Sequence, residues 1–315
     1  MSVSQVSAAG EAGISVIIPT RNGGAFLPAL FAGLEKQTCR PLEVIVVDSS
    51  STDDSRAIAR DFGAEVLVIP VAEFDHGGTR TRMGQRAGGD ILVYLTQDAV
   101  VADEHALQRL VAPFFTDDRI AVTFGRQLPN RDASLFAEHI RLFNYGTSSY
   151  VRCWEDRKKY GLRTAFVSNS FAAYRKKTLA ACGYFRDGLL FGEDTCAVTT
   201  LLRRGHCIAY VADARVYHSH NYSIAEDFRR YFDIGAFHRR QSWLVESLGR
   251  PEGEGMRYLR SELKFLWKKR KFGSFPEFFL RIGGKLLGYK MGNRYDLLPR
   301  RIVSFFSMNR RFWQK

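Results

Sequence analysis

Three short segments of this chain carry residue types that could bind a metal ion or move a proton. Asp98 stands in YLTQDAVV, the adjacent acids Glu193 and Asp194 in FGEDTCAV, and His218 and His220 in VYHSHNY. Mg²⁺ and Mn²⁺ prefer carboxylate oxygens, so Asp98 could hold a divalent cation that bridges two phosphates. One acid of the FGED pair could act as a general base toward a hydroxyl group.

Each of these segments also has a plain structural interpretation. Asp98 could be a solvated carboxylate at the end of a strand, and acids at a helix start are favoured by the helix dipole. His218 and His220 are two apart, so an extended strand would point both rings to one face, where they could bind metal or phosphate. Either histidine could equally be an ordinary hydrogen-bonding residue.

A fourth acid, Asp48, ends the apolar run LEVIVVD and precedes SSSTDD. A carboxylate there could accept the imide proton of a uracil or thymine base, or could serve as a loop or helix-capping residue. The segment TRNGGAF lacks the G-x-G-x-x-G spacing of a dinucleotide-binding turn. This absence disfavours a hydride-transfer enzyme.

The elements that would position these residues alternate between strand and helix. Apolar runs predict strands at 14–19, 42–48, 64–70 and 90–98, with helices between them, including one over 79–88. This alternation predicts an α/β fold with a mainly parallel sheet. Ligands bind beyond the carboxyl ends of such strands, where Thr20, Asp48, Asp75 and Asp98 fall. Further on we expect a strand at 165–174, a helix at 194–204 and a strand at 207–217.

Composition divides the chain into a nearly neutral part and a basic end. Of 46 Lys and Arg residues and 33 Asp and Glu residues, 21 and 9 respectively lie between 225 and 315, a stretch that is also aromatic and patterned as helix. A basic surface can bind nucleic acid, an anionic membrane or an anionic substrate. The five cysteines lack a metal-binding or redox spacing and are predicted to be reduced thiols. No apolar run reaches the length of a membrane-spanning helix.

Taken together, these motifs resemble the family 2 glycosyltransferases of the GT-A fold, over roughly residues 14–222. SVIIPTRNGG and VIVVDSSSTDDS are similar to that family's nucleotide-binding start, TQDA to a reduced D-x-D metal motif, and FGED to its acidic motif. FDHGGTR at 74–80 resembles a signature of bacterial rhamnosyltransferases. The resemblance therefore implies dTDP-rhamnose, or a close relative, as the sugar donor.

The resemblance also implies a role for each site residue. Asp194 would be the catalytic base, with Glu193 in support, and Asp98 and His218 would bind Mg²⁺ or Mn²⁺. The implied donor-binding residues are Thr20, Arg21, Asn22, Asp48, Asp75, His76, Arg80 and Gln97.

The expected architecture is a flexible tail (1–13), a GT-A catalytic domain (14–222) and a helical basic C-terminal region (223–315). The expected activity is inverting transfer of a sugar from a nucleotide diphosphate to a hydroxyl of a surface polysaccharide or lipid-linked glycan. We expect a cytoplasmic protein, peripheral to the membrane if its basic end binds anionic lipid, and no nucleic-acid partner. The alternatives are a basic nucleic-acid-binding protein on an α/β scaffold and a GT-A protein that has lost activity.

Overall fold

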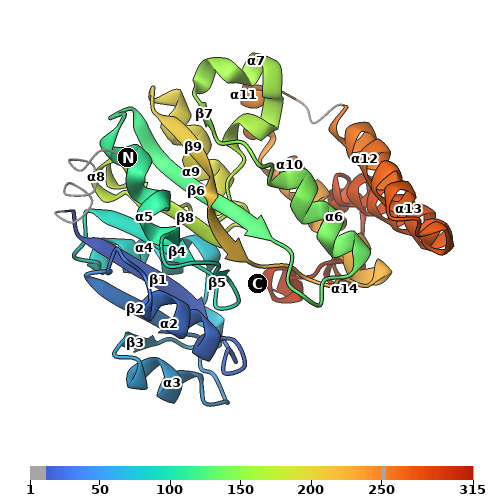
Figure 1. The fold of residues 1–315 in the computed structure, drawn as a ribbon. Helices are drawn as coiled ribbons and strands as arrows, with labels where there is room; N and C mark the ends of the chain where they lie inside the picture. Colours follow the sequence, from blue (N-terminus) through green and yellow to red (C-terminus); the bar gives the residue numbers. More distant parts are fainter. Residues whose placement is uncertain (1–11, 250–252, 315) are drawn as a thin grey trace.

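A nine-stranded sheet forms the centre of the computed structural model, which describes residues 12–249 and 253–314 (Figure 1). Most of the predicted tail, 1–13, lies outside the described residues. The strand order is β3-β2-β1-β4-β8-β6-β9-β5, and β7 pairs with β9 beside this path. The strands are β1 (Ile14–Thr20), β2 (Glu43–Asp48), β3 (Glu65–Val68), β4 (Ile91–Leu95), β5 (Val100–Val101), β6 (Ile120–Leu128), β7 (Tyr150–Arg152), β8 (Phe171–Arg175) and β9 (Cys207–Tyr217).

The first four strands run parallel, as their apolar runs predict. Thr20 pairs with Asp48 and Asp48 with Val68, so the carboxyl ends of β1, β2 and β3 lie at one edge. Val16 and Ile18 join the core on one face of the sheet, while Ile17 joins the core on the other. Burial on both faces explains why these strands read as continuous apolar sequence rather than as an alternating pattern.

Beyond β4 the sheet becomes mixed. β8 is antiparallel to both β4 and β6, whereas β9 is parallel to β6. The predicted strand at 165–174 begins only at Phe171, because residues 161–165 form a 3₁₀ turn. The antiparallel pair of β4 and β8 brings the start of β8 beside the end of β4, where Leu95 pairs with Phe171.

Helices cover both faces of the sheet and form the C-terminal region. Those before residue 223 are α2 (Leu27–Glu35), α3 (Ser55–Asp61), α4 (His76–Arg86), α5 (Ala106–Val111), α6 (Leu135–Asn144), α7 (Arg157–Tyr160), α8 (Lys176–Ala181) and α9 (Glu193–Arg203). After it come α10 (Ile224–Arg240), α11 (Ser242–Leu248), α12 (Glu254–Lys268), α13 (Phe275–Gly292) and α14 (Arg300–Phe306).

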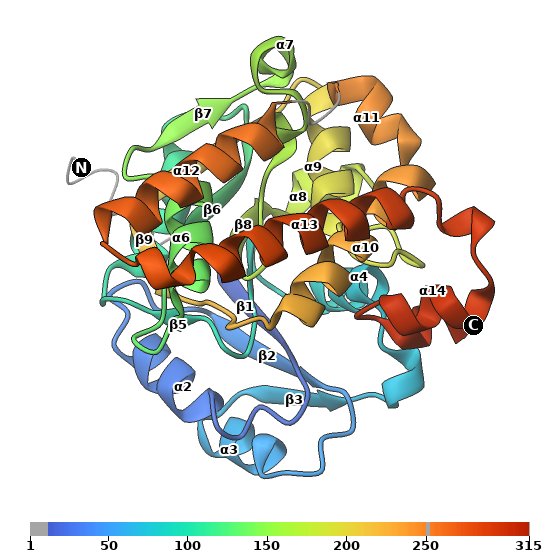
Figure 2. The ribbon, with the colours of Figure 1, turned by 90° about the vertical axis from the view of Figure 1, so that its right-hand side faces the viewer.

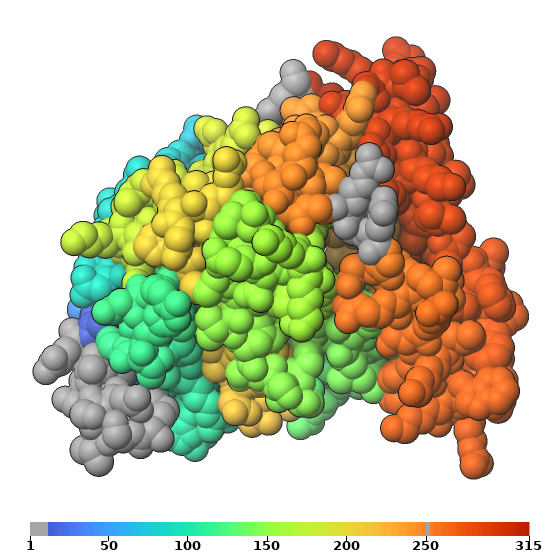
Figure 3. Space-filling view, turned by 90° about the horizontal axis from the view of Figure 1, so that it is seen from above, coloured from blue at the N-terminus to red at the C-terminus, as the bar shows by residue number. Residues whose placement is uncertain are grey.

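The C-terminal helices form one side of the molecule. In the space-filling view most of the orange-to-red surface lies on one side, beside the sheet-containing part (Figure 3). α10 begins with a capping box, in which Ser223 and Glu226 bind each other's backbone N–H groups. Among the described residues, no helix has the length and apolar content needed to cross a bilayer.

Two of the five cysteines are joined, contrary to the prediction of reduced thiols. Arg152 of β7 pairs with Ile208 of β9, so the antiparallel register places Cys153 opposite Cys207 across the two strands. Their Cα atoms are 4.3 Å apart and the sulfur atoms form a disulfide. Cys182 and Cys196 remain thiols. The sequence spacing of 54 residues gave no sign of this pairing.

Candidate active site

The fold brings Asp98, His218 and His220 into one cluster, although Asp98 lies some 120 residues before the histidines. Asp98 follows β4, whereas both histidines follow β9, and the ligand atoms of the three side chains all lie within 4.8 Å of one another. His218 Nε2 is 3.4 Å from one Asp98 oxygen and His220 Nδ1 is 3.9 Å from the other. The prediction that the two rings point to one face is confirmed, and His220 joins the two residues expected to bind metal.

Gln127, at the end of β6, fixes the orientation of His218. Its Oε1 lies 2.9 Å from His218 Nδ1 and accepts a hydrogen bond of 2.5 Å from Arg141. An amide oxygen that accepts from both neighbours requires the proton of His218 on Nδ1. Nε2 then faces Asp98, and loss of its proton would leave a lone pair in that direction, as a metal ligand needs. Sequence reasoning missed Gln127, whose only signal was a polar residue within the buried strand IAVTFGRQL.

The ionisation of this cluster suits a cation. Burial opposes the charge of Asp98, but the hydrogen bond and charge of His218 outweigh it and hold the pKa of Asp98 well below its usual range. Burial, aided by His218, lowers the pKa of His220 to about 4. At neutral pH the cluster therefore offers an anionic carboxylate and a neutral His220 ring, which are the forms that bind metal.

Glu193 and Asp194 open α9 after Gly192, whose positive φ of 78° turns the chain into the helix. Asn169 holds both acids: its backbone N–H donates to Asp194 Oδ2 at 3.3 Å and its side chain donates to Glu193 Oε1 at 3.2 Å. Thr96, two residues before Asp98, donates through its backbone N–H to the carbonyl of Ser170. The two acids and the Asp98 cluster are thus attached to the same segment at the start of β8.

The two acids have opposite electrostatic environments. Arg80 lies 3.0 Å from Glu193 and both side chains are almost fully buried. Burial opposes ionisation of Glu193, but Arg80 outweighs it and lowers the pKa of Glu193. For Asp194, burial and the neighbouring charge of Glu193 outweigh the charge of Arg80 and raise its pKa to about 6. Of the two acids, Asp194 therefore has the proton affinity closer to that of a base working near neutral pH.

At the carboxyl end of β2, Asp48 is fully buried with one oxygen unused. Its Oδ1 accepts from Ser51 N–H at 2.9 Å, while no described residue hydrogen-bonds to Oδ2. A buried carboxylate oxygen without a donor is costly unless a ligand supplies one. Asn22 joins this edge through loop contacts, since its Oδ1 accepts from the Thr52 N–H and its own N–H donates to Ser51.

Several predicted donor-binding residues use their side chains in hydrogen bonds to other parts of the chain. Asp75 caps α4 by accepting from Gly78 N–H at 2.7 Å, and its other oxygen accepts from Gly188 N–H at 3.1 Å. The side-chain amide of Gln97 accepts from and donates to the backbone of Arg21. Together with the Arg80–Glu193 pair, these contacts join three of the predicted donor-binding residues to other parts of the chain.

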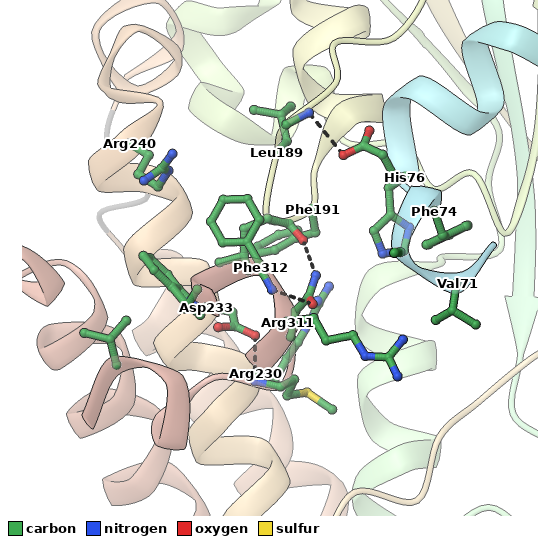
Figure 4. Close-up of a pocket in the computed structure, with 18 of the residues that line it drawn as sticks. Val71, Phe74, His76, Leu189, Phe191, Arg230, Asp233, Arg240, Arg311 and Phe312 are labelled. Carbon is green, nitrogen blue, oxygen red and sulfur yellow. Dashed lines mark hydrogen bonds between the residues drawn. The ribbon is translucent and has the colours of Figure 1, made fainter. Parts of the chain in front are cut away.

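A cavity of about 1040 Å³ lies between the sheet edge and the C-terminal region. Thr20, Arg21 and Gln97 line it from the sheet edge and His76 from the start of α4. Figure 4 shows Val71, Phe74 and His76 on one side and Asp233, Arg240 and Phe312 on the other. Arg230 and Arg311 also line it. The acids of α9 and the Asp98 cluster lie outside this lining.

The fold, with a cluster that could hold a cation, is that of a glycosyltransferase of the GT-A type. A mannosyltransferase from Pyrobaculum calidifontis, solved with GDP-Man and Mn²⁺, shares this fold at a TM-score of 0.58 and 16% identity, covering 96% of this chain and 85% of its own. The chain belongs to glycosyl transferase family 2, whose model matches residues 15–183.

Two curated proteins are similar over nearly the whole length. The O-antigen chain rhamnosyltransferase WbaN of Salmonella anatum is 40% identical over 95% of both chains. The O-antigen chain rhamnosyltransferase RfbN of Salmonella typhimurium is 39% identical over 95% of this chain and 96% of its own. Both similarities extend through the C-terminal region, so the relatives share more than the catalytic core. The predicted membership of family 2 is confirmed.

Proposed function

We propose that this glycosyltransferase moves rhamnose from dTDP-rhamnose to a hydroxyl group of a surface polysaccharide or lipid-linked glycan, with inversion at the anomeric carbon. The observation that carries the proposal is the 40% identity, over 95% of the chain, to an O-antigen chain rhamnosyltransferase. The FDHGGTR segment is consistent with it. We assign catalysis to 14–222 and leave 1–13 and 223–315 as tail and helical C-terminal region.

The donor nucleotide would bind at the edge formed by Thr20 and Asp48. The unused oxygen of Asp48 would accept the imide N–H of thymine, which a buried carboxylate can do without competition from water. Arg21 and Arg230 line the cavity and would face the negatively charged diphosphate. We assign Asn22, Asp75, Arg80 and Gln97 to holding this edge in shape, because their side chains engage other parts of the chain.

Asp98 and His218, with His220, would hold a divalent cation, Mg²⁺ or Mn²⁺. The donor set fits, since it supplies one carboxylate and two imidazoles whose ligand atoms lie within 4.8 Å of one another. A bound divalent ion would offset the negative charge that grows on the diphosphate as it leaves. Gln127 keeps His218 Nε2 directed at the site.

Asp194 would accept the proton of the acceptor hydroxyl. The oxygen then forms a bond to the anomeric carbon on the side opposite the diphosphate, which leaves with the electron pair of the broken C–O bond. A carboxyl with a pKa of about 6 is ionised at neutral pH and still has a useful proton affinity. Glu193, neutralised by Arg80, would keep the start of α9 in place.

A panel of nucleotide sugars tests the proposal. We expect release of nucleoside diphosphate from dTDP-rhamnose, dependent on Mg²⁺ or Mn²⁺, in the presence of a lipid-linked or polysaccharide acceptor. UDP-glucose and GDP-mannose are the matched donors that should give little product. Turnover confined to one of these two would overturn the donor assignment, and an unchanged rate in excess chelator would overturn the metal assignment. Such acceptors and donors would place the enzyme in the cytoplasm, at the inner face of the cytoplasmic membrane.

A further inference from the structure

α13 buries two of its basic residues and exposes four of its large apolar residues. Arg281 and Lys285 are 6% and 5% exposed. In contrast, the exposed fractions of Phe279, Leu280, Leu286 and Leu287 are 64%, 62%, 55% and 54%. A helix on the surface of a globular protein ordinarily has the opposite arrangement, with its apolar stripe facing the core. The exposure of these apolar residues on α13 therefore indicates a surface that contacts something other than water.

The inner side of α13 is held in place by buried charge pairs. Arg281 lies 2.5 Å from Asp227 of α10, and Lys285 lies 3.8 Å from the same carboxylate. Lys285 also donates to the hydroxyl of Tyr258, which donates to Glu262 at 2.6 Å. Turning α13 to bury its leucines would break these pairs and leave charges uncompensated in the interior, which is strongly unfavourable.

Close backbone packing fixes the same orientation independently. A Cβ atom built at Gly288 or Gly292 of α13 would collide with the backbone carbonyl of Phe228 or Phe232 on α10. One built at Gly235 of α10 would collide with the carbonyl of Tyr289. Only glycine allows the two helices to approach this closely. The outward direction of the apolar residues is thus a property of the fold rather than of flexible side chains.

The exposed apolar surface continues past the start of α13. We define the α13 outer face as Trp267, Phe272, Phe279, Leu280, Leu286 and Leu287, all at least half exposed. The rings of Trp267 and Phe272 contact each other edge to face at 5.3 Å. Figure 2 looks onto α12 and α13, which lie on the outside of the molecule. Large apolar patches of this kind mark interaction surfaces.

Positive charge surrounds the α13 outer face. Residues 264–301 contain eleven Lys and Arg residues, of which only Arg281 and Lys285 are buried, and two acids. Both acids are already paired, Glu277 with Arg281 and Asp296 with Arg239. Within the described chain, no salt bridge engages Lys268 or Lys271, and both are exposed. A second copy docked on this face would meet the same positive charge, whereas an anionic surface would neutralise it.

We propose that the α13 outer face lies in the interface of an anionic lipid bilayer, with its aromatic and aliphatic side chains among the acyl chains and the flanking lysines and arginines on the phosphate headgroups. Aromatic rings, leucines and basic residues in this arrangement are what an interfacial helix needs. The proposed function enters this inference only as the reason for membrane binding, which would bring the active site to a lipid-linked acceptor. The binding itself depends on the surface alone.

Flotation of the full chain with lipid vesicles tests this surface. We expect binding to phosphatidylglycerol-containing vesicles, reduced by salt, and little binding to pure phosphatidylcholine vesicles. The Phe279→Ser/Leu286→Ser/Leu287→Ser variant should lose at least about tenfold in vesicle affinity, because it removes apolar area from the interface. The Leu42→Ser/Val151→Ser variant, with exposed apolar residues on other elements, is the control and should bind like the wild type.

A second pair of variants tests the charge contribution. Lys268→Gln/Lys271→Gln should weaken binding by about 25-fold, since each basic residue near an anionic surface contributes about fivefold. Lys158→Gln/Lys159→Gln removes the same charge from α7, also at exposed positions, and should have no effect. Because all substituted residues are exposed, the melting temperature should stay unchanged and will show that each variant folds.

Three results would overturn the proposal: no flotation of the wild-type chain, equal losses in the test and control variants, or a dimer in light scattering that the triple variant converts to monomer. The last result would assign the face to a second copy. Release of nucleotide from dTDP-rhamnose with a soluble acceptor is measured in parallel. Its failure would contradict the proposed function without touching the vesicle result.

Discussion

Replacing Asp194 by asparagine should abolish turnover without reducing stability. Asn keeps the shape of the side chain but cannot accept the acceptor's proton. General-base catalysis contributes roughly a hundredfold to ten-thousandfold in rate, so kcat should fall by that factor while donor binding stays near normal. The measurements are steady-state release of nucleoside diphosphate and calorimetric titration with donor.

The stability side of this prediction follows from the raised pKa. A carboxyl that moves from its ordinary pKa of 3.8 to about 6 on folding holds its proton more tightly in the folded state. Stability is therefore lost as pH rises from about 4 to 6, and above that the charge costs on the order of 1 to 3 kcal/mol. Asn removes this cost but leaves one backbone N–H, of Thr195 or Asn169, without its acceptor, a loss of about 1 kcal/mol.

We therefore expect Asp194→Asn to unfold at the same or a higher denaturant concentration than wild type at pH 8, and to lose this advantage at pH 5. Wild-type turnover should fall as pH drops below about 6, because the base becomes protonated. Glu193→Gln is the matched variant. It weakens the buried pair with Arg80 and should cost on the order of 3 kcal/mol of stability. Near-normal turnover by Asp194→Asn would refute the assignment, and so would a stability loss as large as that of Glu193→Gln.

The remaining predictions concern metal, nucleotide and packing. Asp98→Asn should sharply weaken metal binding and metal-supported turnover. His218→Ala should weaken both less, because phosphate oxygens complete part of the coordination shell. Calorimetric titration with Mn²⁺ measures the affinity of each variant, and unchanged affinity in both would contradict the site. Gln127→Leu frees the tautomer of His218 and should lower metal affinity by about 10- to 100-fold, with the loss absent if the ring is held by other contacts. Asp48→Asn should weaken dTDP binding with little change in the melting temperature, and equal loss of dTDP and inorganic diphosphate binding would argue against a base contact. Arg281→Met leaves Asp227 buried without its main partner and should cost about 3 to 5 kcal/mol in urea unfolding, whereas retained stability would show that the neighbouring lysine suffices.

The sheet edge was predictable because apolar runs and polar strand ends are local signals. The segment 42–48 predicts β2 and the position of Asp48, and VYHSHNY predicts two rings on one face; both agree with the structure. Family membership followed from the order of the same motifs. Helix α4 begins at His76 rather than at 79, because Asp75 provides its N-cap. The two glycines after His76 are poor helix formers, so the sequence did not predict this first turn.

Pairings between distant residues were not predictable. Nothing in the sequence indicated that Arg80 would neutralise Glu193, more than a hundred residues away, or that Asn169 would hold both acids of α9. The same holds for the Cys153–Cys207 disulfide, which depends on the register of β7 against β9. The Asn169 and cysteine contacts lie in the antiparallel half of the sheet, and a single sequence does not reveal that arrangement.

The glycine contacts between α10 and α13 have a consequence for which acceptors can react. α10 carries Arg230 and Asp233 at the cavity, and its backbone touches that of α13 at Gly288 and Gly292. Two helices in backbone contact move as one body. If the outer side of α13 rests on a bilayer, the cavity stands at a fixed height above the lipid, and a carrier-bound glycan reacts only when its terminal sugar reaches that height. The enzyme would then select acceptors by length as well as by chemistry, and inserting one sugar between lipid and acceptor terminus should change the rate more than altering the lipid tail.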